Sequence, residues 1–361
     1  MASLVTMDAI RAAQRRIAGV AVRTGLHPVS PKRLRSAGFA DLPFRLYIKA
    51  ESEQPIGSFK LRGAYNRIAQ LSAQELSRGV VTYSSGNHAQ GVAYSARALG
   101  AKAVIVMPEN TPAIKRRATE AMGAEIVLVG PASSERREKA EDLARTHGYT
   151  VIPPYDDPAI IAGQGTCGLE ILEQLGLIPP EGTAGSADAP QGSLIAQGGV
   201  VILSPVSGGG LLSGIATAVK LAAPESARVQ VWGVEPELAA DAKESFDTRT
   251  LVEWPAAKTT RTISDGLRTQ SLGVLNFAHI MRFVDGIVTV SEDEIMAAMR
   301  VMLAATGLIA EPSGAVTLAA ALFHHGELPR CNALVAVLSG GNIDPEMGRQ
   351  FDASVAANAS A

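Results

Sequence analysis

The residues that most directly suggest chemistry are three consecutive glycines at positions 208–210. A buried-strand pattern at residues 200–203 leads into them, and a helical pattern at residues 211–221 follows them. Glycines let backbone N–H groups converge, and a helix N-terminus carries partial positive charge, so this segment predicts a phosphate-binding loop. The loop lacks both the Walker lysine and the Gly-x-Gly-x-x-Gly dinucleotide spacing, which favours a compact phosphorylated cofactor held by amides.

A lysine, Lys60, opens a helical pattern directly after the Gly57-Ser58 turn. A helix N-terminus disfavours positive charge, so we expect Lys60 to lose its proton more readily than a surface lysine does. A neutral amine is the form that condenses with an aldehyde to give a Schiff base. A single lysine is most often a solvated charge, but a phosphate loop elsewhere in the chain favours the reactive interpretation.

Polar side chains follow two further strand patterns, at the edge of an open α/β sheet where ligands usually bind. The hydroxyls, amide and imidazole after the first pattern suit a substrate carboxylate; they belong to Ser84, Ser85, Asn87 and His88. His88 invites a general-base interpretation, but we favour a histidine that only orients the loop. Ser339 follows the second pattern and could exchange a hydrogen bond with a ring nitrogen.

Strand and helix patterns that alternate along the chain must position these residues. The strand patterns lie at 45–49, 80–84, 103–107, 126–129, 200–203, 229–234, 287–290 and 334–338. The helical patterns lie at 88–99, 112–122, 134–146, 159–175, 211–221 and 292–305, the last with Ser291 as its N-cap. Strands joined through crossover helices predict an α/β fold with parallel sheets and helices on both faces.

Composition narrows the class of protein. The chain has 361 residues and a formal net charge of −2, which allows two lobes and gives no reason to expect nucleic acid or an acidic membrane as partner. It has two cysteines, no signal-peptide pattern and no membrane-spanning run, which predicts a cytoplasmic protein. We expect a surface loop at residues 179–199 and a frayed tail.

Taken together, these segments resemble the fold-type II pyridoxal-phosphate enzymes, most closely the threonine/serine dehydratase and serine racemase group. The similar segments follow the family's order and lie at 57–64, 84–93, 162–166, 205–215, 265–266, 311–315 and 337–344. The resemblance implies two open parallel-sheet lobes, as in the β-subunit of tryptophan synthase, with the cofactor in the cleft between them. A large cofactor-binding lobe would comprise residues 1–79 and 159–352, a small mobile lobe residues 80–158, and a disordered tail residues 353–361. It also implies a homodimer.

The resemblance assigns roles to individual residues. Lys60 would form the Schiff base with pyridoxal 5′-phosphate and then act as catalytic base, and Tyr155 would border the space for the substrate side chain. The other cofactor contacts would be Phe59 beside the ring, Asn87 at the phenolic oxygen, Ser339 at the pyridine nitrogen, Glu311 near the ring, and Ser207, Gly208, Gly209, Gly210 and Leu211 around the phosphate. The family usually has a fourth glycine where Ser207 stands. The substrate carboxylate would contact Ser84, Ser85, Asn87 and His88.

A divalent cation is also implied. The racemase-like members bind one at the positions that match Glu235, the carbonyl of Ala239 and Asp241. Oxygen ligands suit Mg²⁺ or Ca²⁺. The alternative is that these are solvated acids at the start of a helix.

The function implied by the resemblance is that of a dehydratase, which converts a β-hydroxy-α-amino acid to a 2-oxo acid and ammonia. Threonine and serine are the expected substrates, a bulkier one such as phenylserine is an alternative, and hydroxyaspartate ranks lowest because no arginine is clearly placed for a second carboxylate. Ser85 keeps an amino-acid racemase open, since it matches the second acid/base of the racemases. The segment at residues 58–63 argues against a β-replacement synthase. An intact Lys60 and phosphate loop argue against a non-catalytic binding protein.

Overall fold

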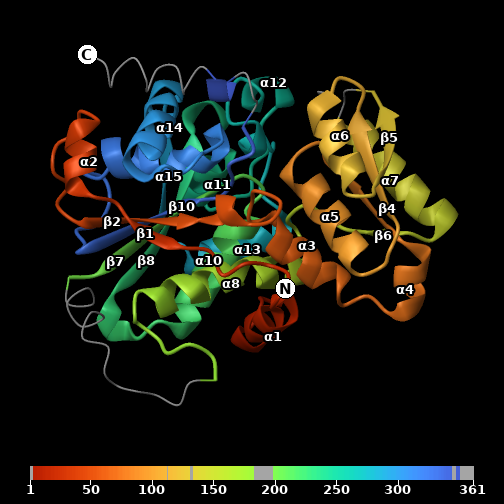
Figure 1. Ribbon diagram of the computed structural model, residues 1–361, viewed down its shortest axis with the longest axis horizontal. Helices are drawn as coiled ribbons and strands as arrows, with labels where there is room; N and C mark the ends of the chain where they lie inside the picture. Colours follow the sequence, from red (N-terminus) through yellow and green to blue (C-terminus); the bar gives the residue numbers. More distant parts are fainter. Residues whose placement is uncertain (1–2, 112, 131–132, 183–197, 344–346, 350–361) are drawn as a thin grey trace.

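The computed structural model describes residues 3–111, 113–130, 133–182, 198–343 and 347–349, and its strands form two separate sheets (Figure 1). The large sheet has the order β1-β2-β10-β7-β8-β9, and the small sheet has the order β5-β4-β3-β6. Every strand pair is parallel except β1 with β2. The α/β class with parallel sheets that the sequence predicts is therefore confirmed.

The strands are β1 (Leu26–Pro28), β2 (Arg45–Ala50), β3 (Val80–Tyr83), β4 (Ala103–Pro108), β5 (Glu125–Val129), β6 (Thr150–Val151), β7 (Val200–Pro205), β8 (Val229–Pro236), β9 (Gly286–Val290) and β10 (Ala333–Leu338). The α-helices are α1 (Met7–Ile17), α2 (Pro31–Ser36), α3 (Lys60–Ile68), α4 (Ala73–Arg78), α5 (Asn87–Ala98), α6 (Ala113–Ala121), α7 (Ser133–His147), α8 (Pro158–Gln174), α10 (Gly210–Ala222), α11 (Asp241–Thr248), α12 (Ala256–Thr259), α13 (Val274–Phe283), α14 (Glu292–Thr306) and α15 (Pro312–Phe323). Short 3₁₀ turns are η1 (Glu51–Glu53), η2 (Glu225–Ala227), η3 (Glu237–Ala239) and η4 (Asp265–Leu267).

All eight strand patterns and all six helical patterns found in the sequence are elements of the structure, with ends displaced by no more than two residues. Ser291 caps α14 as expected, because its side chain accepts the backbone N–H of Glu294 while the Glu294 carboxylate accepts that of Ser291. Strands β1 and β6 were missed because two or three residues are too few for a periodic pattern.

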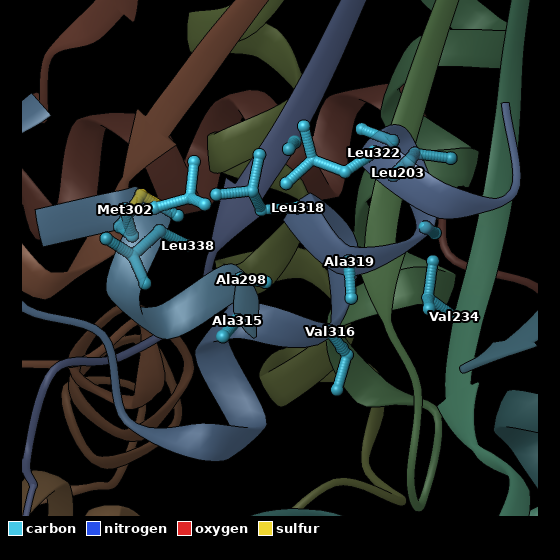
Figure 2. Close-up of a cluster of buried hydrophobic side chains, with 14 of the residues drawn as sticks. Leu203, Val234, Ala298, Met302, Ala315, Val316, Leu318, Ala319, Leu322 and Leu338 are labelled. Atoms are coloured by element: carbon cyan, nitrogen blue, oxygen red, sulfur yellow. The ribbon is translucent and has the colours of Figure 1, made fainter. Parts of the chain in front are cut away.

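Helices cover both faces of the large sheet. Figure 2 shows one face, where Ala298 and Met302 of α14 and apolar residues of α15 pack near side chains of β7, β8 and β10. On the other face, α8 and α10 lie against the same strands. A Cβ atom on Gly214 of α10 would lie 2.5 Å from the backbone oxygen of Ile161 in α8, so a glycine is required for the two helices to approach this closely.

The small sheet and its helices form one side of the molecule in Figure 1, and the large sheet forms the other. All strands of the small sheet lie between Val80 and Val151. The lobe boundaries and the mobility of the small lobe stay predictions. The predicted tail and most of the predicted loop at 179–199 lie outside the described residues. Within the described parts of the chain, no helix is both long and apolar enough to cross a membrane.

Candidate active site

A cavity of about 880 Å³ lies between the two sheets, where several parallel strands end. The ends of β3, β7 and β10 each contribute to its wall, together with the turn before α3. Every residue predicted to contact cofactor or substrate lines this cavity: Phe59, Lys60, Ser84, Ser85, Asn87, His88, Tyr155, Ser207, Gly208, Gly209, Gly210, Leu211, Glu311 and Ser339. The predicted metal ligands do not line it. The fold thus brings together segments that are up to 280 positions apart in the sequence.

Lys60 is the first residue of α3, and its Nζ donates a hydrogen bond of 2.8 Å to the carbonyl oxygen of Pro154. The ammonium lies 5.2 Å from the centroid of the Phe59 ring. Burial lowers the pKa of Lys60 from 10.5 to about 8, although the negative charge of Glu311 acts to raise it. The predicted direction of the shift is confirmed, but the dominant cause is burial rather than the helix N-terminus.

The glycine loop has the geometry of an anion cradle. Gly209 has φ of +95° and is the N-cap residue of α10, a conformation that favours glycine. A Cβ atom on Gly208 would lie 2.4 Å from the ring of Tyr155, so the phenol packs directly on the loop. The Ser207 hydroxyl, at the position of the family's usual fourth glycine, shares a hydrogen bond of 2.8 Å with the hydroxyl of Thr269.

These residues fit pyridoxal phosphate. The backbone of Gly208, Gly209 and Gly210 lines the cavity at the N-terminus of α10, where backbone N–H groups attract an anion. A side chain at Gly208 would collide with the Tyr155 ring and one at Gly209 with α13, so this loop conformation requires both glycines. The partly neutral amine of Lys60 lines the same cavity and matches an aldehyde. The backbone N–H of Phe59 donates to the carbonyl of Ser339, at 3.0 Å, which joins the lysine turn to the end of β10.

A chain of amide and carboxyl groups crosses the cavity wall. The side-chain nitrogen of Asn87 donates to Glu311 at 2.7 Å, and the side-chain nitrogen of Asn342 donates to Asn87 at 2.7 Å. Burial, with the nearby charge of Asp265, raises the pKa of Glu311 to about 8, and the hydrogen bond from Asn87 partly opposes the shift. The individual role of Asn342 was missed in the sequence. Its position at the end of β10, beside Ser339, is the signal that could have identified it.

The loop after β3 forms part of the cavity wall. Ser84 and Ser85 both line it, and the Ser84 hydroxyl accepts the backbone N–H of Gly86 at 3.4 Å. The Nε2 atom of His88 lies 3.1 Å from the carbonyl oxygen of Ile152. Burial, together with the positive charge of Lys60, lowers the pKa of His88 to about 3. A neutral imidazole that donates to a backbone carbonyl is consistent with a loop-orienting role.

Two arginines of α7, a helix packed on the small sheet, line the cavity, contrary to the sequence-based expectation that no arginine is clearly placed for a second carboxylate. They are Arg136 and Arg137. Arg136 is half-buried, and burial lowers its pKa. Arg137 pairs with Glu141 at 2.8 Å. The signal was available, because a helix that follows a parallel strand begins at the ligand-binding edge of its sheet.

Two further basic residues reach the cavity. Lys115 of α6 forms an ion pair of 2.6 Å with Asp265 of η4, and both residues line the cavity. Arg268 also lines it, and its Nε donates to the carbonyl of Thr262 at 2.9 Å. The cavity wall therefore contains more basic side chains than the sequence analysis had placed there.

The predicted cation ligands lie together at the end of β8. The carboxylate of Glu235 accepts the backbone N–H groups of Ala242 and Lys243 at 3.1 and 2.8 Å. Both carboxylate oxygens of Asp241 are buried and have no hydrogen-bond partner among the described residues. Burial, with the charge of Asp241, raises the pKa of Glu235, and burial raises that of Asp241 to about 7. Two buried carboxylates whose charge is poorly compensated fit a divalent cation.

The cation site is sparse in strong ligands. Within the described parts of the chain, no cluster of three or more His, Cys, Asp or Glu side chains could hold a metal ion. Two carboxylates and the carbonyl of Ala239 would have to be completed by water.

Comparison with known proteins places this geometry in context. The sequence pattern of the family described as "Pyridoxal-phosphate dependent enzyme" matches residues 28–340. The chain is 39% identical over 300 residues to an L-threo-3-hydroxyaspartate ammonia-lyase of Saccharomyces cerevisiae, covering 83% of each chain. It is 35% identical to a serine racemase of Schizosaccharomyces pombe, covering 96% of this chain and 97% of that one. The crystal structure of a threonine deaminase from T.th. superposes with a TM-score of 0.80 at 43% identity, covering 94% of this chain and 99% of that one.

Proposed function

The chain belongs to the family of pyridoxal-phosphate dependent enzymes, and on that premise we propose that it is an ammonia-lyase acting on β-hydroxy-α-amino acids. The observation that supports this most strongly is the half-buried Lys60 amine, with its pKa of about 8, in one cavity with the glycine loop. The reaction removes hydrogen from Cα and hydroxide from Cβ as water, and hydrolysis then releases ammonia and a 2-oxo acid.

The cofactor supplies the electron withdrawal that makes the α-proton of an attached amino acid acidic. The protein supplies the remaining functions. Amides of the glycine loop would hold the phosphate, and the Ser339 hydroxyl would serve as a neutral partner for the ring nitrogen. The neutral form of Lys60 would accept the α-proton at Nζ. Ser84 and Asn87 would hold the substrate carboxylate at the end of β3 and so orient the α-hydrogen toward that amine.

Racemisation is the second candidate function, because Ser85 lines the same cavity. A racemase needs a second group that can return a proton to the opposite face of the α-carbon, and a hydroxyl can serve as that group. One of the similar proteins is a serine racemase. The two functions differ in product, since a racemase returns the amino acid with inverted configuration and a lyase does not.

Among the possible substrates we favour one with a second carboxylate, of the 3-hydroxyaspartate class. This reverses the order expected from the sequence, because half-buried Arg136 lines the cavity. A guanidinium recognises a carboxylate through two parallel hydrogen bonds, and partial exclusion of water strengthens them. One of the similar proteins is an L-threo-3-hydroxyaspartate ammonia-lyase. Threonine, serine and phenylserine are the competing substrates.

A panel of β-hydroxy-α-amino acids tests the function and the substrate class together. The enzyme, loaded with pyridoxal phosphate, is assayed with 3-hydroxyaspartate, threonine, serine and phenylserine. Both the amount of 2-oxo acid and the configuration of the recovered substrate are measured. We expect 2-oxo acid from all active substrates and the highest kcat/KM for 3-hydroxyaspartate. If the recovered substrate has inverted configuration and no 2-oxo acid is formed, the protein is a racemase and not a lyase.

Arg136→Ala tests the substrate class separately. Loss of two charge-assisted hydrogen bonds should lower kcat/KM for 3-hydroxyaspartate about a hundredfold while changing that for threonine only a few-fold. Arg137→Ala is the matched control, because its side chain is exposed and paired with Glu141. An equal loss for both substrates in Arg136→Ala would contradict a carboxylate-binding role.

We also propose that Glu235, the Ala239 carbonyl and Asp241 hold Mg²⁺ or Ca²⁺, supported by the buried oxygens of Asp241. The cytoplasmic location and the homodimer stay predictions from the sequence.

A further inference from the structure

The segment at residues 154–157 connects the small sheet to α8 and passes along the cavity. Its first two residues contact the site directly: the Pro154 carbonyl accepts the hydrogen bond from Lys60, and the Tyr155 ring packs on the glycine loop. The third residue, Asp156, does not line the cavity and has no role in the function described above. Its contacts nevertheless connect it to the glycine loop.

The Asp156 carboxylate caps a helix that is distant in sequence. It accepts the backbone N–H groups of Val274, Leu275 and Asn276, the first residues of α13, at 3.1, 2.9 and 3.3 Å. The N-cap residue of α13 is Gly273, which has no side chain to satisfy these donors.

The space for this carboxylate depends on the same glycine. A Cβ atom on Gly273 would lie 2.4 Å from a carboxylate oxygen of Asp156. A side chain at position 273 would therefore displace the carboxylate. Gly273 has no side chain to cap α13, and for the same reason it leaves space for a carboxylate from elsewhere in the chain. Asp156 therefore takes the place of the missing N-cap side chain.

The first turn of α13 in turn holds the glycine loop. The backbone N–H of Gly273 and the side-chain nitrogen of Asn276 both donate to the carbonyl oxygen of Gly208, at 3.0 and 2.7 Å. A Cβ atom on Gly209 would lie 2.9 Å from the Cβ of Asn276, so the two segments are in direct contact. Two donors from one helix turn thus fix the direction of a single carbonyl group.

Peptide geometry transmits this constraint to the next residue. The Gly208 carbonyl and the Gly209 N–H belong to one planar trans peptide, in which C=O and N–H point in opposite directions. When α13 holds the carbonyl on one side, the N–H of Gly209 must point to the other side. Gly208, Gly209 and Gly210 all line the cavity.

We infer that Asp156 is a positioning residue, which acts through α13 and the Gly208 carbonyl to aim the Gly209 amide at the anion that the loop binds. This inference rests on cofactor binding in the cavity and is independent of the substrate proposed above. It also makes Gly273 a required partner of Asp156. The segment at residues 154–157 would then connect three parts of the site: Lys60, the Tyr155 ring that packs on the glycine loop, and the amides of that loop that would bind the phosphate.

The test compares pyridoxal phosphate with pyridoxal, which has the same aldehyde and no phosphate. Apoprotein is titrated with each compound, and Schiff-base absorbance gives the two Kd values. We expect Asp156→Ala to weaken pyridoxal phosphate about tenfold, as for loss of one well-aimed hydrogen bond to a charged group, and to leave pyridoxal unchanged. Asp156→Asn should restore the wild-type ratio of the two Kd values, because an amide oxygen also caps a helix.

Asp157→Ala is the matched control. Asp157 caps α8 through the N–H groups of Ala159 and Ile160, so its loss should lower the melting temperature without changing the ratio. If Asp156→Ala does not fold, Gly273→Ala tests the same contact by displacing the carboxylate, and it should shift the ratio in the same direction.

If folded Asp156→Ala keeps the wild-type ratio of the two Kd values, or if it binds pyridoxal phosphate and pyridoxal more weakly by the same factor, the inference is overturned. The readout is binding rather than turnover, so it separates this inference from the proposed function. A wild-type protein that binds pyridoxal phosphate but converts no hydroxy amino acid would contradict the proposed function alone.

Discussion

Lys60 and Glu311 line the same cavity, and burial brings the pKa values of their two side chains together, to about 8 for each. The amine is shifted down from 10.5 and the carboxyl up from 4.5, because burial disfavours the charged form of both. Near neutral pH, Glu311 is therefore mainly a neutral acid that accepts a hydrogen bond from Asn87. The number of protons that the site binds therefore changes near pH 8, where Lys60 and Glu311 both titrate.

The reactivity of Lys60 in the apoprotein should follow this lowered pKa. We expect the rate of its reductive labelling by pyridoxal to rise with pH and to level off near pH 8, since the neutral amine is the reactive form. Surface lysines should continue to gain rate toward about pH 10. Mass spectrometry of peptides from one sample measures both. A Lys60 rate that rises in parallel with the surface lysines would contradict the lowered pKa.

Glu311→Gln should reduce the pH dependence of stability. In the wild type, the unfolded carboxyl ionises near pH 4.5 and the folded one near pH 8, so the stabilising contribution is complete below 4.5 and is lost as pH rises toward 8. Glutamine keeps an oxygen that can accept from Asn87 and does not ionise. Melting temperatures of the apoprotein between pH 4.5 and 8 should therefore fall less steeply in the variant.

The control for that series is Glu237→Gln, which changes an exposed carboxyl and should keep the wild-type slope. Identical slopes for the wild type and Glu311→Gln would show that the buried carboxyl does not titrate in this range.

Arg62→Ala should strongly destabilise the fold. The Arg62 side chain is fully buried and donates two hydrogen bonds to Glu51, at 2.7 and 2.8 Å, and two to Glu170, at the same two distances. Its removal leaves the buried carboxylate of Glu51 without its guanidinium partner and that of Glu170 with its ion pair to Lys49, and such losses cost about 3–5 kcal/mol. Urea unfolding measures the difference.

Arg145→Ala provides the comparison for Arg62, because Arg145 forms an exposed pair with Asp142, which water and salt screen, and its loss should barely change the stability. Arg62→Lys keeps the charge but cannot bridge both carboxylates in the same way, so its stability should lie between those of the wild type and the alanine variant. Equal stability of Arg62→Ala and Arg145→Ala would refute the proposed importance of the buried ion pairs of Arg62 with Glu51 and Glu170.

Divalent cations should raise the melting temperature of the wild type and have no effect on Asp241→Asn. The two Asp241 oxygens are buried and find no hydrogen-bond partner in the part of the chain that the structure describes, so a cation would compensate their charge. Without cation, the variant should be at least as stable as the wild type, because a neutral amide is less costly to bury. A similar cation-induced shift in both proteins would place the binding elsewhere.

Among the described residues, local patterns predicted eight of the ten strands, six of the α-helices, the start of α3 at Lys60 and most of the residue types in the site. The strand and helix patterns depend on which residues are apolar at short spacing, and Lys60, the glycines and the polar strand ends lie at element boundaries that such patterns define. The boundaries of β1 and β6 could not be predicted, because very short strands are set by their neighbours in the sheet.

The contacts between distant segments required the tertiary structure. The sequence contains Arg136 and Asp156, but only the packing of the two sheets places the first in the cavity and the second on α13. Burial, rather than position at the helix end, determines the pKa of Lys60.

The amino-acid sequence by itself determined the α/β elements, the order of the motifs and the chemical types of the site residues, because all of these are properties of short segments. Tertiary structure alone decided which side chains meet and how strongly water is excluded from them. The physical reason is that β10 lies between β2 and β7, so residues far apart in the chain share one edge of a sheet. Their mutual distances and burial depend on that strand order, which no local pattern specifies.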